Sequence, residues 1–142
     1  MSKPVRYLKL AYLLMRKALD ERLSAYGLTT SQCEILGYLY AEPPVEQQRL
    51  QRRSGVTSAT LTGILDTLQG RGYLVRTPSE SDGRANLVAL TTAGSELFAR
   101  IIDVFHDFEQ ELLNGFSESE RLLLADWLER IARNLGYRGP DK

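Results

Sequence analysis

The sequence contains one cysteine and one histidine in 142 residues, and this scarcity excludes several kinds of site. Cys33 alone cannot form a disulfide within the chain, and Cys33 with His106 supplies too few soft ligands for a zinc site. We therefore expect no metal and no cofactor.

Long apolar runs are missing as well. No stretch approaches the roughly 18 consecutive apolar residues of a membrane-spanning helix. Residues 1–9 lack the apolar core and the small-residue cleavage site of a secretory signal. We therefore expect a cytoplasmic protein without a membrane partner.

The motifs of common enzymes are also absent. The sequence has no glycine-rich phosphate loop, no nucleophile elbow and no histidine beside a plausible nucleophile. We do not expect an enzyme.

The net charge is zero, which by itself disfavours nucleic acid as a partner, because DNA-binding domains are often strongly basic. The charge is unevenly distributed, however. Six basic and two acidic residues give residues 1–26 a net charge of +4, and six arginines against four acids give residues 45–90 +2. Nine acids against four arginines give residues 95–135 a net charge of −5. A neutral chain can therefore present a mildly positive face.

The apolar residues, 43% of the chain, are enough for one domain spanning residues 1–142. Apolar residues at three- and four-residue steps predict a first helix at about 4–26, ended by Gly27. This helix is apolar around much of its circumference, as expected in a dimer core. A second helix begins at a capping box formed by Thr29 and Gln32 and continues towards Pro43 and Pro44.

The middle of the chain predicts two more helices followed by a hairpin. Residues 45–54 form a third helix closed by Gly55, and Thr57 caps a fourth. Residues 73–77 and 86–90 are rich in β-formers and flank a long polar turn. A fifth helix from residue 92 and a last helix opened by a capping box at Ser117 and Glu120 complete the chain near residue 135.

Two helices joined through Gly55, with a hairpin directly after the second, are the parts of a winged helix-turn-helix at about residues 28–91. We thus predict a mainly α fold with a small β-hairpin wing. Five segments carry a resemblance to the MarR family of bacterial transcriptional regulators: Leu28–Gln32, Ser54–Thr62, Leu68–Arg76, Asp82–Arg84 and Leu90–Gly94.

The resemblance implies a homodimer whose helices at about 4–26 and 92–135 form the dimerisation region. It also implies that the dimer represses transcription from a near-palindromic operator in double-stranded DNA, and that a small aromatic or anionic effector releases it.

The first turns of the fourth helix are the expected groove-reading surface, because a helix usually enters the major groove by its N-terminal end. This surface lacks Arg, Lys, Asn and Gln, so we expect it to read DNA through hydroxyls, methyl groups and DNA shape. Its residues are Thr57, Ser58, Ala59, Thr60, Thr62 and Gly63.

Arginines supply the positive charge that this surface lacks. Arg84, in the hairpin turn, is the candidate for a narrow minor groove, with Asp82 orienting its guanidinium and Arg76 sharing that carboxylate. Arg53 is the third-helix candidate for a phosphate contact, with Arg49 and Arg52 as neighbours. A solvated charged surface is the alternative for all of these arginines.

Two other functions remain open alongside the ligand-responsive repressor. One is a redox-sensing regulator in which Cys33 is the switch, although its position at the start of the second helix suggests burial. The other is a winged-helix module that binds proteins and not DNA, which the neutral charge favours. No effector-binding residues are assigned. A set of polar aromatic residues and one arginine either lines an effector pocket or packs in the core: Tyr7, Tyr12, Arg16, Tyr26 and Tyr38.

Overall fold

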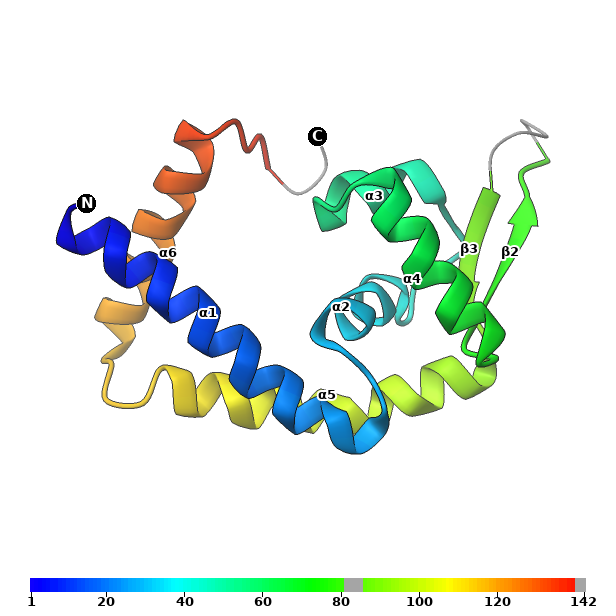
Figure 1. Cartoon of the computed structure of the whole chain (residues 1–142), viewed down its shortest axis with the longest axis horizontal. Helices are drawn as coiled ribbons and strands as arrows, with labels where there is room; N and C mark the ends of the chain where they lie inside the picture. The colour runs from blue at the N-terminus through cyan, green and yellow to red at the C-terminus, as the bar shows by residue number, and fades with distance from the viewer. Residues whose placement is uncertain (81–85, 140–142) are drawn as a thin grey trace. The chain divides into compact units, whose positions relative to one another are not determined.

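The computed structural model describes residues 1–80 and 86–139 and is mainly helical, with one small antiparallel sheet (Figure 1). The chain divides into two compact units, residues 1–105 and 106–142. The elements are α1 (Lys3–Leu23), a 3-10 turn (Ser24–Tyr26), α2 (Thr30–Leu39), β1 (Val45–Glu46), α3 (Gln47–Ser54), α4 (Ser58–Gly70), β2 (Leu74–Pro78), β3 (Asn86–Leu90), α5 (Thr92–Leu112) and α6 (Glu118–Asn134).

The sheet has three strands in the order β1-β3-β2, one more than the sequence predicts. Val45 and Glu46, expected at the start of a helix, pair instead with Val88 and Leu87 of β3. Val45 is buried, and burial of this β-branched side chain against the sheet outweighs the local preference for helix. Helix α3 therefore begins at Gln47.

Two predicted helix starts are confirmed by their hydrogen bonds. At α2, the Thr29 hydroxyl oxygen accepts from the Gln32 amide at 3.2 Å, and the Gln32 side-chain oxygen accepts from the Thr29 amide at 3.0 Å. Ser117 and Glu120 form the same reciprocal pair at α6. Both capping boxes satisfy amides that have no partner inside the helix.

Two helix ends differ from the sequence prediction. The regular part of α1 ends at Leu23, and a 3-10 turn carries the chain to Gly27, whose φ of 68° is left-handed. Helix α2 ends at Leu39, before the two prolines, and Ala41 adopts a φ of 58°. A non-glycine residue in this region is strained by its Cβ, so the turn after α2 is held by its surroundings.

The first unit encloses an aliphatic core contributed by both helices and strands. Helix α4 packs on β2, and α2 packs on β3. Among the described residues, ten aliphatic core side chains are at most 1% exposed: Leu23, Ile35, Leu36, Leu50, Leu61, Leu65, Leu68, Leu74, Val88 and Ile101. This core fixes α4 against the sheet and leaves the opposite side of α4 exposed.

The start of α5 is fastened to the chain just before β2. The Thr91 amide donates to the Tyr73 carbonyl at 3.1 Å, and the Thr91 hydroxyl donates to the Gly72 carbonyl at 2.6 Å. Gly94 lies against the Tyr73 carbonyl, since a Cβ at position 94 would stand 2.0 Å from the Tyr73 carbonyl oxygen. Residue 94 must therefore be glycine for α5 to approach β2 this closely.

Exposed apolar side chains are most numerous on helices α1 and α6. On α1, in the first unit, they lie on the N-terminal half of the helix and include Leu10, Leu13 and Leu14. On α6, in the second unit, Trp127 is 54% exposed and Leu122 is 64% exposed. Within the described residues, no helix is both long and apolar enough to span a membrane.

Candidate nucleic-acid interface

Helix α4 presents an exposed face beside its buried one. Leu61, Leu65 and Leu68 face the core. Ala59, Thr62, Gly63 and Asp66 are exposed, and their three- and four-residue spacing places them on one side of the helix. We call these four residues, with Ser58, the exposed face of α4. All the predicted groove-reading residues lie here or in the adjoining first turn, as the sequence predicts.

Thr57 fixes the start of α4. Its hydroxyl oxygen accepts from the Thr60 amide at 3.2 Å, and its hydroxyl donates to the Thr60 hydroxyl at 2.9 Å. This cap stabilises the first turn, where the remaining free amides and the helix dipole favour a negatively charged group.

Apart from Asp66, the exposed face of α4 carries only small uncharged residues. A Cβ built at Gly63 would meet no other atom within 4 Å, so the fold of the chain does not require glycine there. The Thr67 hydroxyl donates to the Gly63 carbonyl at 3.1 Å. The Thr67 hydroxyl proton is therefore satisfied inside the helix.

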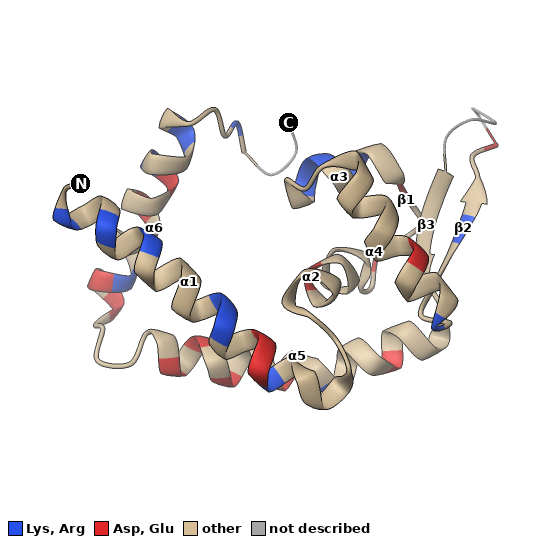
Figure 2. Ribbon diagram, in the orientation of Figure 1, with Lys and Arg blue, Asp and Glu red and all other residues tan. Residues whose placement is uncertain are grey.

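Arg53 lies at the end of α3 with its guanidinium 5.2 Å from the centre of the Tyr38 ring on α2. The side chain is half-buried, and this cation–π contact restrains it. Figure 2 shows basic residues along α3. The Arg53 guanidinium is thus a positive charge restrained by Tyr38, next in the chain to the loop that leads into α4.

Arg76 has partners that the sequence did not predict. Its Nε donates to the Gln69 side-chain oxygen at 2.7 Å, and its Nη2 donates to an Asp66 carboxylate oxygen at 2.5 Å. Both acceptors lie on α4. The expected sharing of the Asp82 carboxylate by Arg76 stays a prediction. Asp82 and Arg84 themselves lie outside the described residues.

Arg71, for which the sequence predicted no role, links the end of α4 to the end of the first helical segment. Its Nη1 donates to the Gly27 carbonyl at 2.7 Å, and its guanidinium lies 5.2 Å from the centre of the Tyr73 ring. The partners are 44 residues apart in the sequence, so no local pattern could have indicated this contact.

The candidate effector residues have separate contacts. Arg16 donates to the Ser31 hydroxyl at 2.8 Å and to the Glu34 carboxylate at 3.2 Å. Tyr38 lies under Arg53, and Tyr7 and Tyr12 are exposed on α1. The Arg16 contacts hold α1 against α2, and none of these contacts assigns an effector site.

Cys33 is fully buried in α2. Desolvation raises the pKa of its thiol to about 12, and the nearby carboxylates of Glu34 and Asp20 act in the same direction. Because the thiolate is the reactive form, this environment suppresses oxidation. His106 is exposed on α5.

The arrangement of these elements matches known proteins. The family model described as the MarR family matches residues 26–85. The HTH-type transcriptional regulator PecS of Dickeya dadantii is 32% identical over 126 residues, covering 87% of this chain and 76% of that protein. The chain belongs to the MarR family.

Solved structures agree with this membership. A mutant of MarR from E. coli, crystallised with operator DNA, superposes with a TM-score of 0.83 at 27% identity, over 89% of this chain and 91% of that chain. The S. aureus MepR–DNA complex superposes with a TM-score of 0.85 at 22% identity, over 94% of this chain and 98% of that chain, which shows the shared fold. The protein is a DNA-binding transcriptional regulator of the MarR type with a winged helix fold.

Proposed function

We propose that this MarR-family protein is a homodimeric repressor that binds a near-palindromic operator and leaves it when a small aromatic or anionic effector binds. The exposed, Thr57-capped first half of α4 is the observation that carries the proposal. Its exposed face points away from the core, and a similar protein, a mutant of MarR from E. coli, was crystallised with operator DNA.

Base reading by α4 relies on small groups. Ser58, Thr60 and Thr62 offer hydroxyls, and Ala59 offers a methyl group to a thymine methyl. None of them can make the bidentate contacts by which Arg or Asn discriminates a base by about 1 to 3 kcal/mol. Sequence-dependent DNA shape must then supply much of the specificity.

Arginines supply affinity in this proposal. Arg84, between β2 and β3, enters the minor groove with Asp82 orienting it, and Arg53 contacts phosphate from the end of α3. Each phosphate that a cation neutralises releases counterions, so binding should weaken steeply as salt rises.

Dimerisation rests on the exposed apolar side chains of α1 and α6. Single exposed leucines are ordinary, but a series along one helix usually marks an interface. On α6 the series comprises Leu122, Leu123, Trp127, Leu128 and Ile131. A second copy of the chain would remove these side chains from water.

The proposal is tested by selection of bound fragments from a random pool of duplex DNA at physiological salt. Enrichment of a near-palindromic sequence is expected. On that sequence, Arg84→Ala should reduce the magnitude of the salt slope by up to about two, roughly 0.9 for each phosphate contact in two half-sites. The matched control is Arg100→Ala, because Arg100 is an exposed arginine of α5 outside the proposed DNA interface. An unchanged slope would remove Arg84 from the mechanism.

A winged-helix module that binds protein is the second candidate, favoured by the zero net charge and the uncharged residues around Gly63. It predicts that the same selection enriches no sequence. A redox switch through Cys33 predicts that peroxide releases DNA from the wild type and not from Cys33→Ser. The buried thiol leads us to expect equal behaviour of the two proteins.

A further inference from the structure

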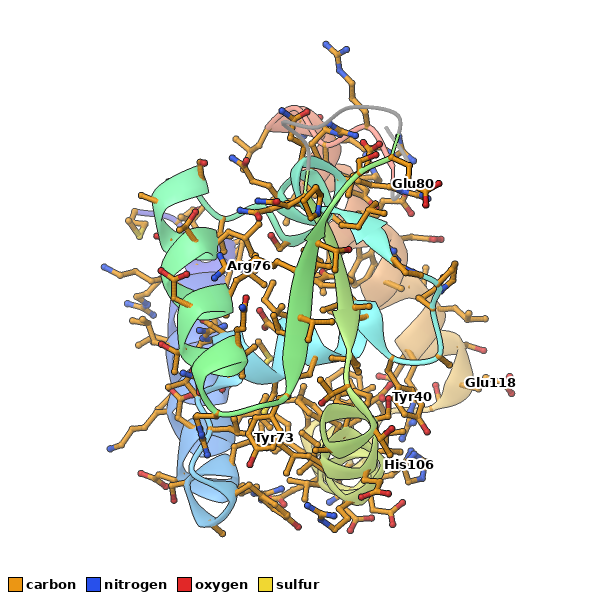
Figure 3. The ribbon with its side chains drawn as sticks, turned by 90° about the vertical axis from the view of Figure 1, so that its right-hand side faces the viewer. Tyr40, Tyr73, Arg76, Glu80, His106 and Glu118 are labelled. Carbon is orange, nitrogen blue, oxygen red and sulfur yellow. The ribbon has the colours of Figure 1, made fainter. Side chains whose placement is uncertain are left out.

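Arg76 extends from β2 to α4 and joins the two elements (Figure 3). Its side chain is 20% exposed, whereas that of Asp66 is 61% exposed. The cation is therefore largely covered, and its carboxylate partner is open to solvent. We call Arg76, Asp66 and Gln69 the Arg76 bridge.

Two different N–H groups of one guanidinium make the contacts of this bridge. Nε reaches Gln69, and Nη2 reaches Asp66, one turn earlier on α4. Because the guanidinium is a planar, rigid fork, two acceptors fix its orientation in a way that one would not. A lysine at this position would keep the charge but would lose the two-point geometry.

Asp66 is the only charged residue of α4 and lies on the same exposed face as Ala59, Thr62 and Gly63. If α4 enters the major groove, an unpaired carboxylate at this position would approach the phosphates and repel them. Arg76 provides the compensating charge from the side of the sheet. The bridge thus removes an electrostatic obstacle on the surface that reads DNA.

The other end of the bridge lies in the strand that leads to Arg84. Arg76 pairs across the sheet with Val88, and β2 continues through Thr77 to Pro78. The position of β2 relative to α4 therefore sets where the strand ends at Pro78. Two points of attachment on α4 fasten this helix to β2, which pairs with β3, and so hold the wing strands β2 and β3 against α4.

We propose that Arg76 is a positioning residue for sequence-specific DNA binding: it aligns the wing with α4 and masks the Asp66 carboxylate, without touching DNA. This inference rests on the proposed DNA-binding function. It differs from a direct phosphate contact by Arg76 in two measurable respects, which are coupling to Asp66 and salt dependence.

The test is a double-mutant cycle of Arg76→Gln, Asp66→Asn and the double variant. Affinity is measured for the duplex that the wild type selects from a random pool and for a scrambled duplex of equal composition. We expect each single variant and the double variant to lose about tenfold in preference for the selected duplex, so that the effects are strongly non-additive. Arg76→Lys should recover only part of the preference, because it restores charge without the fork.

Salt dependence separates positioning from phosphate contact. The double variant removes one positive and one negative charge and should keep the wild-type salt slope. Direct phosphate contact would instead lower the magnitude of the slope by about 0.9 for each half-site and make the two substitutions additive. Thermal unfolding of each variant, with amide exchange of Thr77 in β2, checks that the fold persists while β2 loosens.

Each outcome distinguishes the two levels of the proposal. A wild type that selects no sequence overturns DNA recognition and the inference with it. A wild type that selects a sequence, while the double variant keeps the full preference or loses salt slope, overturns the positioning role of Arg76 alone. Non-additive loss of preference at constant slope is the result that we expect.

Discussion

The leucines of α4, in the first unit, and those of α6, in the second unit, differ sharply in their exposure. In the first, Leu61, Leu65 and Leu68 of α4 are at most 1% exposed, whereas in the second, Leu122 of α6 is 64% exposed and Leu128 is 42% exposed. The first unit therefore has a core of its own. The apolar surface of α6 must be covered by something else, which we propose to be a second copy of the chain. Folding and assembly should accordingly respond to different substitutions.

The largest effect on stability is expected in the first unit, where Gly94 of α5 packs directly against the Tyr73 carbonyl. Gly94→Ala would place a Cβ 2.0 Å from the Tyr73 carbonyl oxygen, a clash with backbone that no rotamer relieves. Relief of this clash requires a shift of α5 away from β2, which should lower the free energy of unfolding by about 3 kcal/mol or more. Thermal and urea unfolding measure this loss. A variant with the wild-type melting temperature would mean that the close approach is absent.

Leucine-to-alanine substitutions in α4 and α6 should give the next largest effects, and they should affect different properties. Leu65→Ala should destabilise the fold by about 2 to 5 kcal/mol, because it leaves a cavity in a fully buried site. Leu128→Ala should leave the monomer's unfolding nearly unchanged but raise the dimer dissociation constant by about tenfold. Analytical ultracentrifugation over a dilution series measures the latter. Equal effects of both substitutions on unfolding, with assembly unaffected, would contradict the division of roles.

The hydrogen bonds between Asp20 and Thr30 make the stability of the first unit depend on pH. An Asp20 carboxylate oxygen accepts from the Thr30 amide and the Thr30 hydroxyl, and these hydrogen bonds hold the pKa of Asp20 below its ordinary value of 3.8. A lowered pKa adds stability above the unfolded-state pKa, and this stability is lost as pH falls through the folded-state value. Asp20 is exposed, so screening limits the contribution to about 1 kcal/mol.

Asp20→Asn should thus cost stability at neutral pH, and the difference from wild type should shrink as pH falls below about 4. Urea unfolding at a series of pH values follows the difference. Thr92→Ala, at an exposed position away from this contact, serves as the control. A difference between wild type and Asp20→Asn that grows in acid would have the wrong sign for this account.

The smallest effect concerns the glycine of the exposed face. Gly63→Ala adds a Cβ that meets nothing within 4 Å, and alanine favours helix over glycine by up to about 1 kcal/mol. Stability should rise slightly, in contrast to Gly94→Ala, while binding of the selected duplex should weaken where the helix approaches the bases. Differential scanning calorimetry and DNA titration report the two quantities. A loss of stability would show that Gly63 serves the fold.

Local interactions explain what the sequence could predict. Thr29, Thr57 and Ser117 cap their helices with hydroxyls that reach amides three residues later, and Gly27 and Gly55 end helices in left-handed conformations. Periodicity placed the predicted groove-reading residues on an exposed surface. That these residues contact DNA stays a prediction.

Contacts between distant segments explain what was missed. Strand β1 exists because Val45 pairs with Val88, and two residues carry no period that could announce a strand. The pairing of Arg76 with Asp66, ten residues apart, arises from the packing of α4 on β2, which no local pattern indicates. The end of α2 at Leu39, ahead of the prolines, likewise depends on the strained turn at Ala41.

The central claim is that the winged helix-turn-helix reads DNA, while α1 and α6 join two copies of the chain. The most direct test is the mass of the complex formed on the selected duplex, measured by light scattering at physiological salt. The account predicts two chains for each near-palindromic duplex. It also predicts that a duplex with one half-site scrambled binds more weakly but still takes up two chains together. A complex containing a single chain, or no selected sequence, would contradict the account.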